Sequence, residues 1–114
     1  MGKIMSAEKR VEEIKRCINS NLSDCSTTME TIAQLVGLNP RYMLRIFKEQ
    51  TGTLLKDYVL KIRIDKAKEL LEKDMTIEMV ARNCGYTSSH SFIRAFKRTC
   101  GMTPGEFKRK IKEE

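Results

Sequence analysis

Positively charged side chains recur within one or two helical turns of each other in two stretches of the sequence. They are Arg41, Arg45 and Lys48 in the first stretch, and Arg94, Lys97 and Arg98 in the second. Residues three or four apart gather on one face of a helix. A basic helix face can bind a polyanion, and arginine can also form two hydrogen bonds to one guanine edge. Binding to a nucleic acid is therefore the first chemistry to consider.

The distribution of charge agrees with two separate basic surfaces. The 114 residues carry a net charge of +7. Residues 41–63 hold six basic and two acidic side chains, and residues 82–112 hold eight and one. The remaining segments are neutral or acidic, which suggests two footprints for one polyanion. A pair of solvated helix faces would carry the same charge, so charge alone does not decide the function.

Cysteine and histidine do not suggest a metal or catalytic site. The four cysteines are Cys17, Cys25, Cys84 and Cys100, and the single histidine is His90. No Cys-x-x-Cys or other zinc spacing is present, so we expect no metal and no other cofactor. Helical periodicity places Cys17, Cys84 and Cys100 at core positions, and we expect these thiols to be reduced and to pack.

The composition is typical of a small globular domain with an aliphatic core. Hydrophobic residues make up 40% of the chain, aromatic residues 6%, and tryptophan is absent. No apolar run approaches the roughly 18 residues of a membrane span, and no signal peptide pattern begins the chain. We therefore expect a cytoplasmic protein without a membrane partner.

Helical periodicity dominates the sequence, and strand signals are weak. Apolar residues recur at three- and four-residue steps in the first segment: Ala7, Val11, Ile14, Ile18 and Leu22. Capping residues and glycines mark the helix ends, with Asn39-Pro40 and a capping box at Thr103–Glu106 as the clearest starts. We predict an all-α fold of seven helices without a sheet, near residues 7–22, 29–36, 40–50, 54–73, 77–84, 88–99 and 104–112.

An internal repeat relates the two basic stretches. Thr28–Leu38 matches Thr76–Tyr86 at an offset of 48 residues. Met43–Lys48 then matches Phe92–Lys97 at an offset of 49, because the second copy has one extra residue in its turn. Chance does not readily produce a repeat of this length with a single insertion point.

Each copy of the repeat has the form of a helix-turn-helix. Ala33 and Ala81 allow two helices to approach closely, and Gly37 and Gly85 permit the sharp turn that follows. A generic helical hairpin needs the same residues, but the cations opposite the apolar face of each second helix favour binding in a DNA major groove. We predict subdomains at residues 7–53 and 74–114, joined by a linking helix at 54–73.

This arrangement resembles the DNA-binding domain of AraC/XylS-type transcription regulators. The resemblance extends from about Val11 to Lys110. Its most specific part is the second copy from Ile77 to Phe107, and the Arg63-x-x-x-Ala67-x-x-Leu70-Leu71 segment also fits.

The resemblance implies sequence-specific binding of double-stranded DNA by a bacterial transcription regulator, an activator. The third and sixth helices would enter successive major grooves. The implied base-contacting residues are Arg41, Leu44 and Arg45 in the first copy, and Ser89, His90 and Arg94 in the second. The expected phosphate contacts involve Lys48, Lys97 and Arg98, and the helix starts at Thr28 and Thr76.

Two residues depart from the family pattern in the first copy. Arg41 could bind a phosphate instead of a base. Leu44 can touch a thymine methyl group but cannot form a hydrogen bond. Base readout by the first copy therefore rests on Arg45, with Arg41 as a second contributor.

The resemblance also implies partners beyond DNA. RNA polymerase and an effector or receiver domain are the partners expected of such a regulator, and no effector or receiver domain is present in these 114 residues. The chain is then either a naturally short regulator or a fragment of a longer one.

Two other classes of function remain open at this point. Similar DNA-binding units occur fused to DNA alkyl-repair domains that use a cysteine nucleophile. No cysteine here has a matching base or metal set, so we expect no enzyme. A helical module that binds acidic proteins would also use basic helix faces. Salt-dependent binding to random DNA, compared with binding to a specific promoter, distinguishes that module from a regulator.

Overall fold

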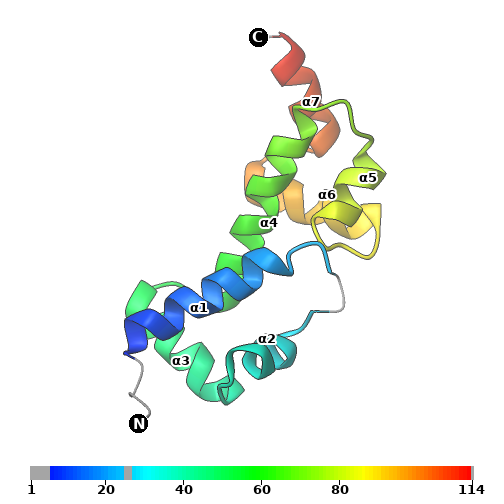
Figure 1. Cartoon of the computed structure of the whole chain (residues 1–114). Helices are drawn as coiled ribbons and strands as arrows, with labels where there is room; N and C mark the ends of the chain where they lie inside the picture. The colour runs from blue at the N-terminus through cyan, green and yellow to red at the C-terminus, as the bar shows by residue number, and fades with distance from the viewer. Residues whose placement is uncertain (1–5, 25–26, 114) are drawn as a thin grey trace. The chain divides into compact units, whose positions relative to one another are not determined.

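The computed structural model describes residues 6–24 and 27–113. Within them the chain forms seven α-helices and no strand, which confirms the all-α prediction (Figure 1). The helices are α1 (Ala7–Ser20), α2 (Met29–Val36), α3 (Pro40–Thr51), α4 (Leu55–Leu71), α5 (Ile77–Asn83), α6 (Ser89–Cys100) and α7 (Pro104–Glu113).

The helices form two compact units. Unit 1 contains α1, α2, α3 and the part of α4 up to Leu60. Unit 2 contains α4 from Lys61 onward, α5, α6 and α7, together with the segment that begins at Leu22. The continuous helix α4 therefore contributes residues to both units. The division at residues 7–53, 54–73 and 74–114 stays a prediction.

Local sequence signals determine where the helices begin. The Asn39 side chain accepts a hydrogen bond from the backbone N–H of Arg41 at 2.9 Å, and Pro40 occupies the first turn of α3. In the capping box of α7, the backbone N–H of Thr103 donates to Glu106 at 2.9 Å. The backbone N–H of Glu106 donates in return to the Thr103 hydroxyl at 3.1 Å. The side chains of Asn39, Thr103 and Glu106 thus accept hydrogen bonds from backbone N–H groups that have no partner within the helix.

The core of unit 1 is aliphatic around one aromatic pair. Its buried residues are Val11, Ile14, Ile18, Ile32, Ala33, Met43, Ile46, Phe47, Leu55 and Val59. The ring of Phe47 packs against the ring of Tyr58, with 5.2 Å between the centroids. Helix α1 contacts both α2 and α3 and so holds the helix-turn-helix together.

The core of unit 2 contains a chain of aromatic rings. Tyr86, Phe92, Phe96 and Phe107 follow one another with centroid separations of 5.5, 5.8 and 5.5 Å. The buried residues around these rings include Leu22, Ile64, Ala67, Leu71, Val80, Ala81, Cys84 and Ala95. Edge-to-face contacts of this kind stabilise a core beyond the burial of area alone.

The cysteines follow the prediction only in part. Cys84 is fully buried in unit 2, as expected for a core residue. Cys17 and Cys100 are only half-buried, so helical periodicity overstated their burial. The amide of Asn21 donates to the Cys17 sulfur at 3.8 Å, which places this thiol near the polar edge of α1. Cys25 lies outside the described residues.

Candidate nucleic-acid interface

Both units contain the same turn between the two helices of the motif. In unit 1, Gly37 ends α2 in the left-handed region at φ 72°, and the backbone N–H of Leu38 donates to the carbonyl of Ala33 at 2.8 Å. In unit 2, Gly85 adopts φ 87°, and the backbone N–H of Tyr86 donates to the carbonyl of Ala81 at 3.0 Å. These bonds connect residues that are equivalent in the repeat, so the helix-turn-helix is present twice.

The two turns differ in how tightly they are packed. A Cβ atom at Gly85 would overlap the carbonyl oxygen of Leu22 and would lie 3.2 Å from both Nε and Nη2 of Arg63. The guanidinium of Arg63 also lies over the Tyr86 ring, 5.5 Å from its centroid. A Cβ atom at Gly37 would meet nothing within 4 Å. Helix α4 therefore supports the turn of unit 2 through Arg63.

Helix α3 presents the predicted residues of unit 1 to solvent. Its buried side chains are Met43, Ile46 and Phe47. A helix turns by about 100° per residue, so positions 41, 45 and 48 fall opposite those three and position 44 lies at their flank. All four predicted side chains are exposed: Arg41, Leu44, Arg45 and Lys48.

Helix α6 presents the equivalent surface in unit 2. Its buried side chains are Phe92, Ala95 and Phe96, which match those of α3 in the repeat. Five of the predicted residues lie on α6: His90, Arg94, Lys97 and Arg98 are exposed, and Ser89 is half-buried. Each unit therefore gathers its own predicted cations on the outer face of one helix.

The two predicted phosphate contacts at helix starts are exposed capping residues. The hydroxyl of Thr28 accepts from the backbone N–H of Thr31 at 3.2 Å at the start of α2. The hydroxyl of Thr76 accepts from the backbone N–H of Met79 at 3.1 Å at the start of α5. These hydroxyls serve the helix, which leaves the other N–H groups of the first turn for a phosphate.

The sequence analysis missed Tyr42, which has two arginines beside its ring. The guanidinium carbon of Arg45 lies 5.4 Å from the ring centroid, and that of Arg10 on α1 lies 5.7 Å from it. Both distances are within the range of a cation–π interaction. The spacing of three residues between Tyr42 and Arg45 could have revealed the first contact, but nothing in the sequence relates Arg10 to this ring. Unit 2 has Ser91 at the equivalent position.

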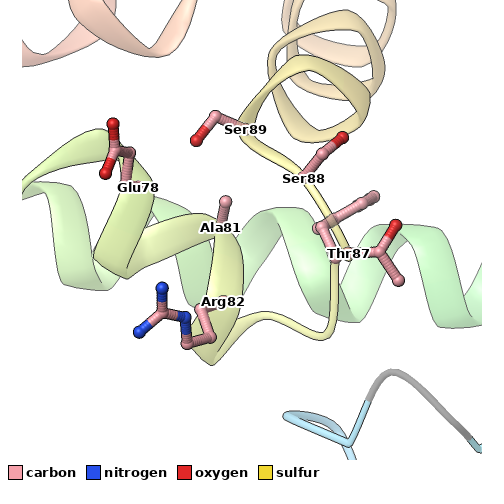
Figure 2. Close-up of a pocket in the computed structure, with 7 residues that line it drawn as sticks. Glu78, Ala81, Arg82, Thr87, Ser88 and Ser89 are labelled. Atoms are coloured by element: carbon pink, nitrogen blue, oxygen red, sulfur yellow. The ribbon is translucent and has the colours of Figure 1, made fainter.

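A groove lies between the two helices of the motif in unit 2. Its volume is about 350 Å³, and the residues that line it belong to α5, the turn and the start of α6. Figure 2 shows the Ala81 side chain pointing from α5 toward the start of α6. Ser89 points toward the α5 side of this groove (Figure 2). Carboxylate, guanidinium and hydroxyl groups thus surround a small opening beside the N-terminus of α6.

A second groove lies on another side of α6. Its volume is about 410 Å³, and it is bounded by the starts of α5 and α7 and by one side of α6. The residues that line it are Ile77, Glu78, Ser89, Ile93, Thr103, Pro104 and Gly105. Ile93 thus borders a largely apolar recess beside the exposed cations of α6.

The thiol of Cys84 is not suited to nucleophilic catalysis. Burial raises the pKa of this thiol to about 11, although Lys66 and Arg63 oppose the shift. A reactive cysteine needs a lowered pKa and access to solvent.

Among residues 6–24 and 27–113, no three histidine, cysteine or acidic side chains come together to hold a metal ion. None of the described helices has the length and hydrophobicity needed to span a membrane.

Comparison with known proteins relates this geometry to a family. A family model described as a helix-turn-helix domain matches residues 32–110. The probable transcription factor PqrA of Proteus vulgaris is 36% identical over 104 residues, which cover 90% of this chain and 85% of PqrA. The arabinose operon regulatory protein of Escherichia coli is 32% identical over 108 residues, which cover 94% of this chain and 37% of that protein.

A solved structure has the same fold. The C-terminal domain of AraT, a response regulator from Geobacillus stearothermophilus, superposes with a TM-score of 0.85 at 30% identity, over 89% of this chain and 84% of that one. The chain spans 38% or less of the length of four other curated relatives that it matches. The chain belongs to the AraC family of transcription regulators, in which it corresponds to the DNA-binding domain with two helix-turn-helix units.

Proposed function

We propose that α3 and α6 read base edges in two successive major grooves of one operator, and that the protein activates transcription in the bacterial cytoplasm. One observation carries this proposal. Both helices expose a basic strip, and two cations of each strip occupy equivalent positions of the repeat: Arg45 matches Arg94, and Lys48 matches Lys97. A B-DNA major groove accepts one α-helix, and its base edges differ in their pattern of donors and acceptors.

The exposed residues divide into base readers and phosphate contacts by their place along the helix. The base readers are Arg41, Leu44 and Arg45 on α3, and Ser89, His90 and Arg94 on α6. The phosphate contacts are Lys48, Lys97 and Arg98, with the first-turn N–H groups after Thr28 and Thr76. N-terminal residues of a recognition helix meet base edges, and residues nearer its C-terminus meet the backbone.

The operator of one chain is asymmetric under this proposal. The two units follow each other head to tail, so they need no two-fold relation. They also differ where bases are read, since His90 replaces Arg41 and Ile93 replaces Leu44 in the repeat. The half-sites should therefore differ in sequence. A minimal site that is a perfect palindrome and binds only two chains would contradict this arrangement.

Further partners follow from the length of the relatives. Since most of those relatives are much longer than this chain, an effector or receiver domain would supply the signal in them. RNA polymerase is the partner that an activator needs. No catalytic step belongs to this proposal, because the function of such a domain is binding.

The test begins with selection of bound sequences from a random duplex pool by the wild-type protein. Arg94→Ala should then remove the preference at one base pair, because one bidentate contact provides roughly 1–3 kcal/mol of discrimination. Arg98→Ala is the matched control, because it should weaken specific and random DNA by similar factors. Unchanged preferences in Arg94→Ala would exclude Arg94 as a base reader.

Salt dependence tests the proposal as a whole. Neutralised phosphates release counterions, so affinity should fall steeply between ~50 and ~200 mM salt. An affinity for duplex DNA that does not change over this range would overturn the DNA-binding role. It would favour a basic surface with an acidic protein as its partner.

A further inference from the structure

An aliphatic side chain precedes the central arginine of each reading helix. Leu44 precedes Arg45 on α3, and Ile93 precedes Arg94 on α6. The repeat makes Leu44 and Ile93 equivalent, and both lie at the flank of the basic strip. Leu44 is 42% exposed, although it lies among cations, and Ile93 is half-buried. A single exposed leucine needs no explanation, but the recurrence of an aliphatic residue at the same place of both motifs does.

The surroundings of Ile93 are largely apolar. Ile93 lines the groove of about 410 Å³ together with Ile77 and Pro104. Thr103 borders the same groove, and its equivalent in unit 1 is Leu54, which is 45% exposed. Apolar surface therefore adjoins Ile93 in unit 2, and Leu44 is itself exposed in unit 1, where a purely electrostatic DNA contact would need no apolar surface.

We infer that Leu44 and Ile93 each read the C5-methyl group of a thymine, one in each half-site. The edge of thymine presents the only methyl group that unmodified DNA offers in the major groove. Leucine and isoleucine side chains have no donor or acceptor, so packing against that methyl group is the discrimination open to them. Each thymine lies beside the base pair that Arg45 or Arg94 contacts. This inference rests on the proposed function.

Deoxyuridine provides the experiment, because it lacks only the methyl group of thymine and keeps its hydrogen-bonding edge. The preferred duplex is found by selection, and each thymine is then replaced singly by deoxyuridine. Removal of one buried methyl group costs about 0.8 kcal/mol, which corresponds to an increase in Kd of about fourfold. One such position is expected in each half-site, and replacements elsewhere should change Kd much less.

Variants then assign each methyl group to its side chain. Leu44→Ala should abolish the deoxyuridine effect in one half-site only, and Ile93→Ala should abolish it in the other. Leu44 is exposed, so its truncation leaves the core of unit 1 intact. Ile93 is half-buried, so Ile93→Val provides a milder second variant that should reduce the effect without unfolding unit 2. Lys48→Ala and Lys97→Ala are matched controls that should keep both effects.

The outcomes separate this inference from the proposed function. Specific, salt-dependent binding that is insensitive to every deoxyuridine would overturn methyl readout and leave the DNA-binding role standing. Deoxyuridine effects that persist unchanged in Leu44→Ala and Ile93→Ala would overturn the assignment to these residues. Absence of any duplex binding by the wild-type protein would overturn the proposed function itself.

Discussion

The two units use one motif but support its parts differently. In unit 1 the turn at Gly37 is open, and the reading helix has an aromatic ring, Tyr42, beside Arg45. In unit 2 the turn has one more residue and packs against Leu22 and Arg63, while Ser91 takes the place of the ring. The comparison shows that a recognition helix can be supported by side chains on its own surface or by backbone packing at its turn.

The units also differ in charge at the end of the reading helix. Glu49 in unit 1 is equivalent to Arg98 in unit 2. The ammonium of Lys48 donates to the carbonyl of Gly52 at 2.9 Å and so satisfies the C-terminus of its own helix. In unit 2, hydrogen bonds from Thr103 lower the pKa of the Glu106 carboxyl group, and the positive charge of Lys97 adds to this effect. We expect unit 2 to make the stronger sequence-independent contacts.

The largest expected effect is on the free energy of unfolding, when the glycines of the two turns are replaced. Gly37→Ala should destabilise the protein by roughly 1–2 kcal/mol, the cost of a left-handed conformation for a residue with a Cβ atom. Gly85→Ala should destabilise the protein by roughly 1–3 kcal/mol more than Gly37→Ala does, because its Cβ atom would overlap a backbone oxygen. Urea unfolding followed by circular dichroism gives both free energies.

Gly105→Ala is a matched control for the turn glycines. Gly105 lies in the first turn of α7, and its Cβ atom would meet only the Thr103 hydroxyl at 3.9 Å. This substitution should leave stability unchanged or raise it slightly. Equal losses for Gly85→Ala and Gly37→Ala would show that packing at the second turn contributes nothing.

Exchange of the charges at positions 49 and 98 should change the salt dependence of DNA binding. Arg98→Glu should weaken binding to random duplex DNA and lower the slope of log K against log salt by about one unit. Glu49→Arg should have the opposite effect, because it adds a cation at the equivalent place. Fluorescence anisotropy at several salt concentrations measures both slopes. Identical slopes in the two variants would show that the charge difference between positions 49 and 98 does not affect DNA binding.

Removal of the ring beside Arg45 should have a smaller effect. Tyr42→Leu should weaken the base preference that depends on Arg45, since an exposed cation–π contact contributes about 0.5–1 kcal/mol. Tyr42→Phe keeps the ring and should behave as wild type. Ser91→Ala is the control in unit 2 and should leave the preference at Arg94 unchanged. Stronger binding by Tyr42→Leu would mean that the ring holds Arg45 away from DNA.

The smallest expected effect concerns acid pH and the capping box of α7. Hydrogen bonds from Thr103 lower the pKa of the Glu106 carboxyl group below its usual range. The folded state therefore gains stability that is complete above the ordinary glutamate pKa and is lost as pH falls through the lowered value. Glu106→Gln should flatten the dependence of unit 2 stability on pH between ~3 and ~5.

Unit 1 supplies the control for that measurement. Asp57 is equivalent to Glu106, but Leu54 replaces Thr103, so the reciprocal side-chain cap is absent there. Asp57→Asn should alter the acid response less than Glu106→Gln does. A titration of Glu106 by NMR that gives an ordinary glutamate pKa would contradict the expected effect.

Local signals in the sequence predicted most of the fold. Helix α2 begins and ends as the predicted 29–36 segment does, and the Asn39-Pro40 start and the Thr103 capping box have the predicted geometry. The repeat also identified which second-helix residues are exposed. These features depend on neighbours within four residues or on comparison of the two copies, and both kinds of information are present in one sequence.

Contacts between distant segments could not be predicted in the same way. Arg63 supports a turn 22 positions further along the chain, and Arg10 reaches Tyr42 from another helix. The ammonium of Lys108 donates to the carbonyl of Met75 at 2.7 Å. Periodicity assigns each residue to a face of its own helix, but it does not say which other helix that face meets. The half-buried state of Cys17 escaped prediction for the same reason.

The buried thiol of Cys84 is a natural probe of how often unit 2 opens. The side chain is 0% exposed and its pKa of about 11 keeps it protonated at neutral pH. An alkylating reagent can therefore modify it only during the intervals when unit 2 opens. Cys17 is half-buried, so we expect it to react without such an opening and to calibrate the reagent. Mass spectrometry of the labelled chain would then report how often the unit opens in the native protein, with and without DNA, without any engineered probe.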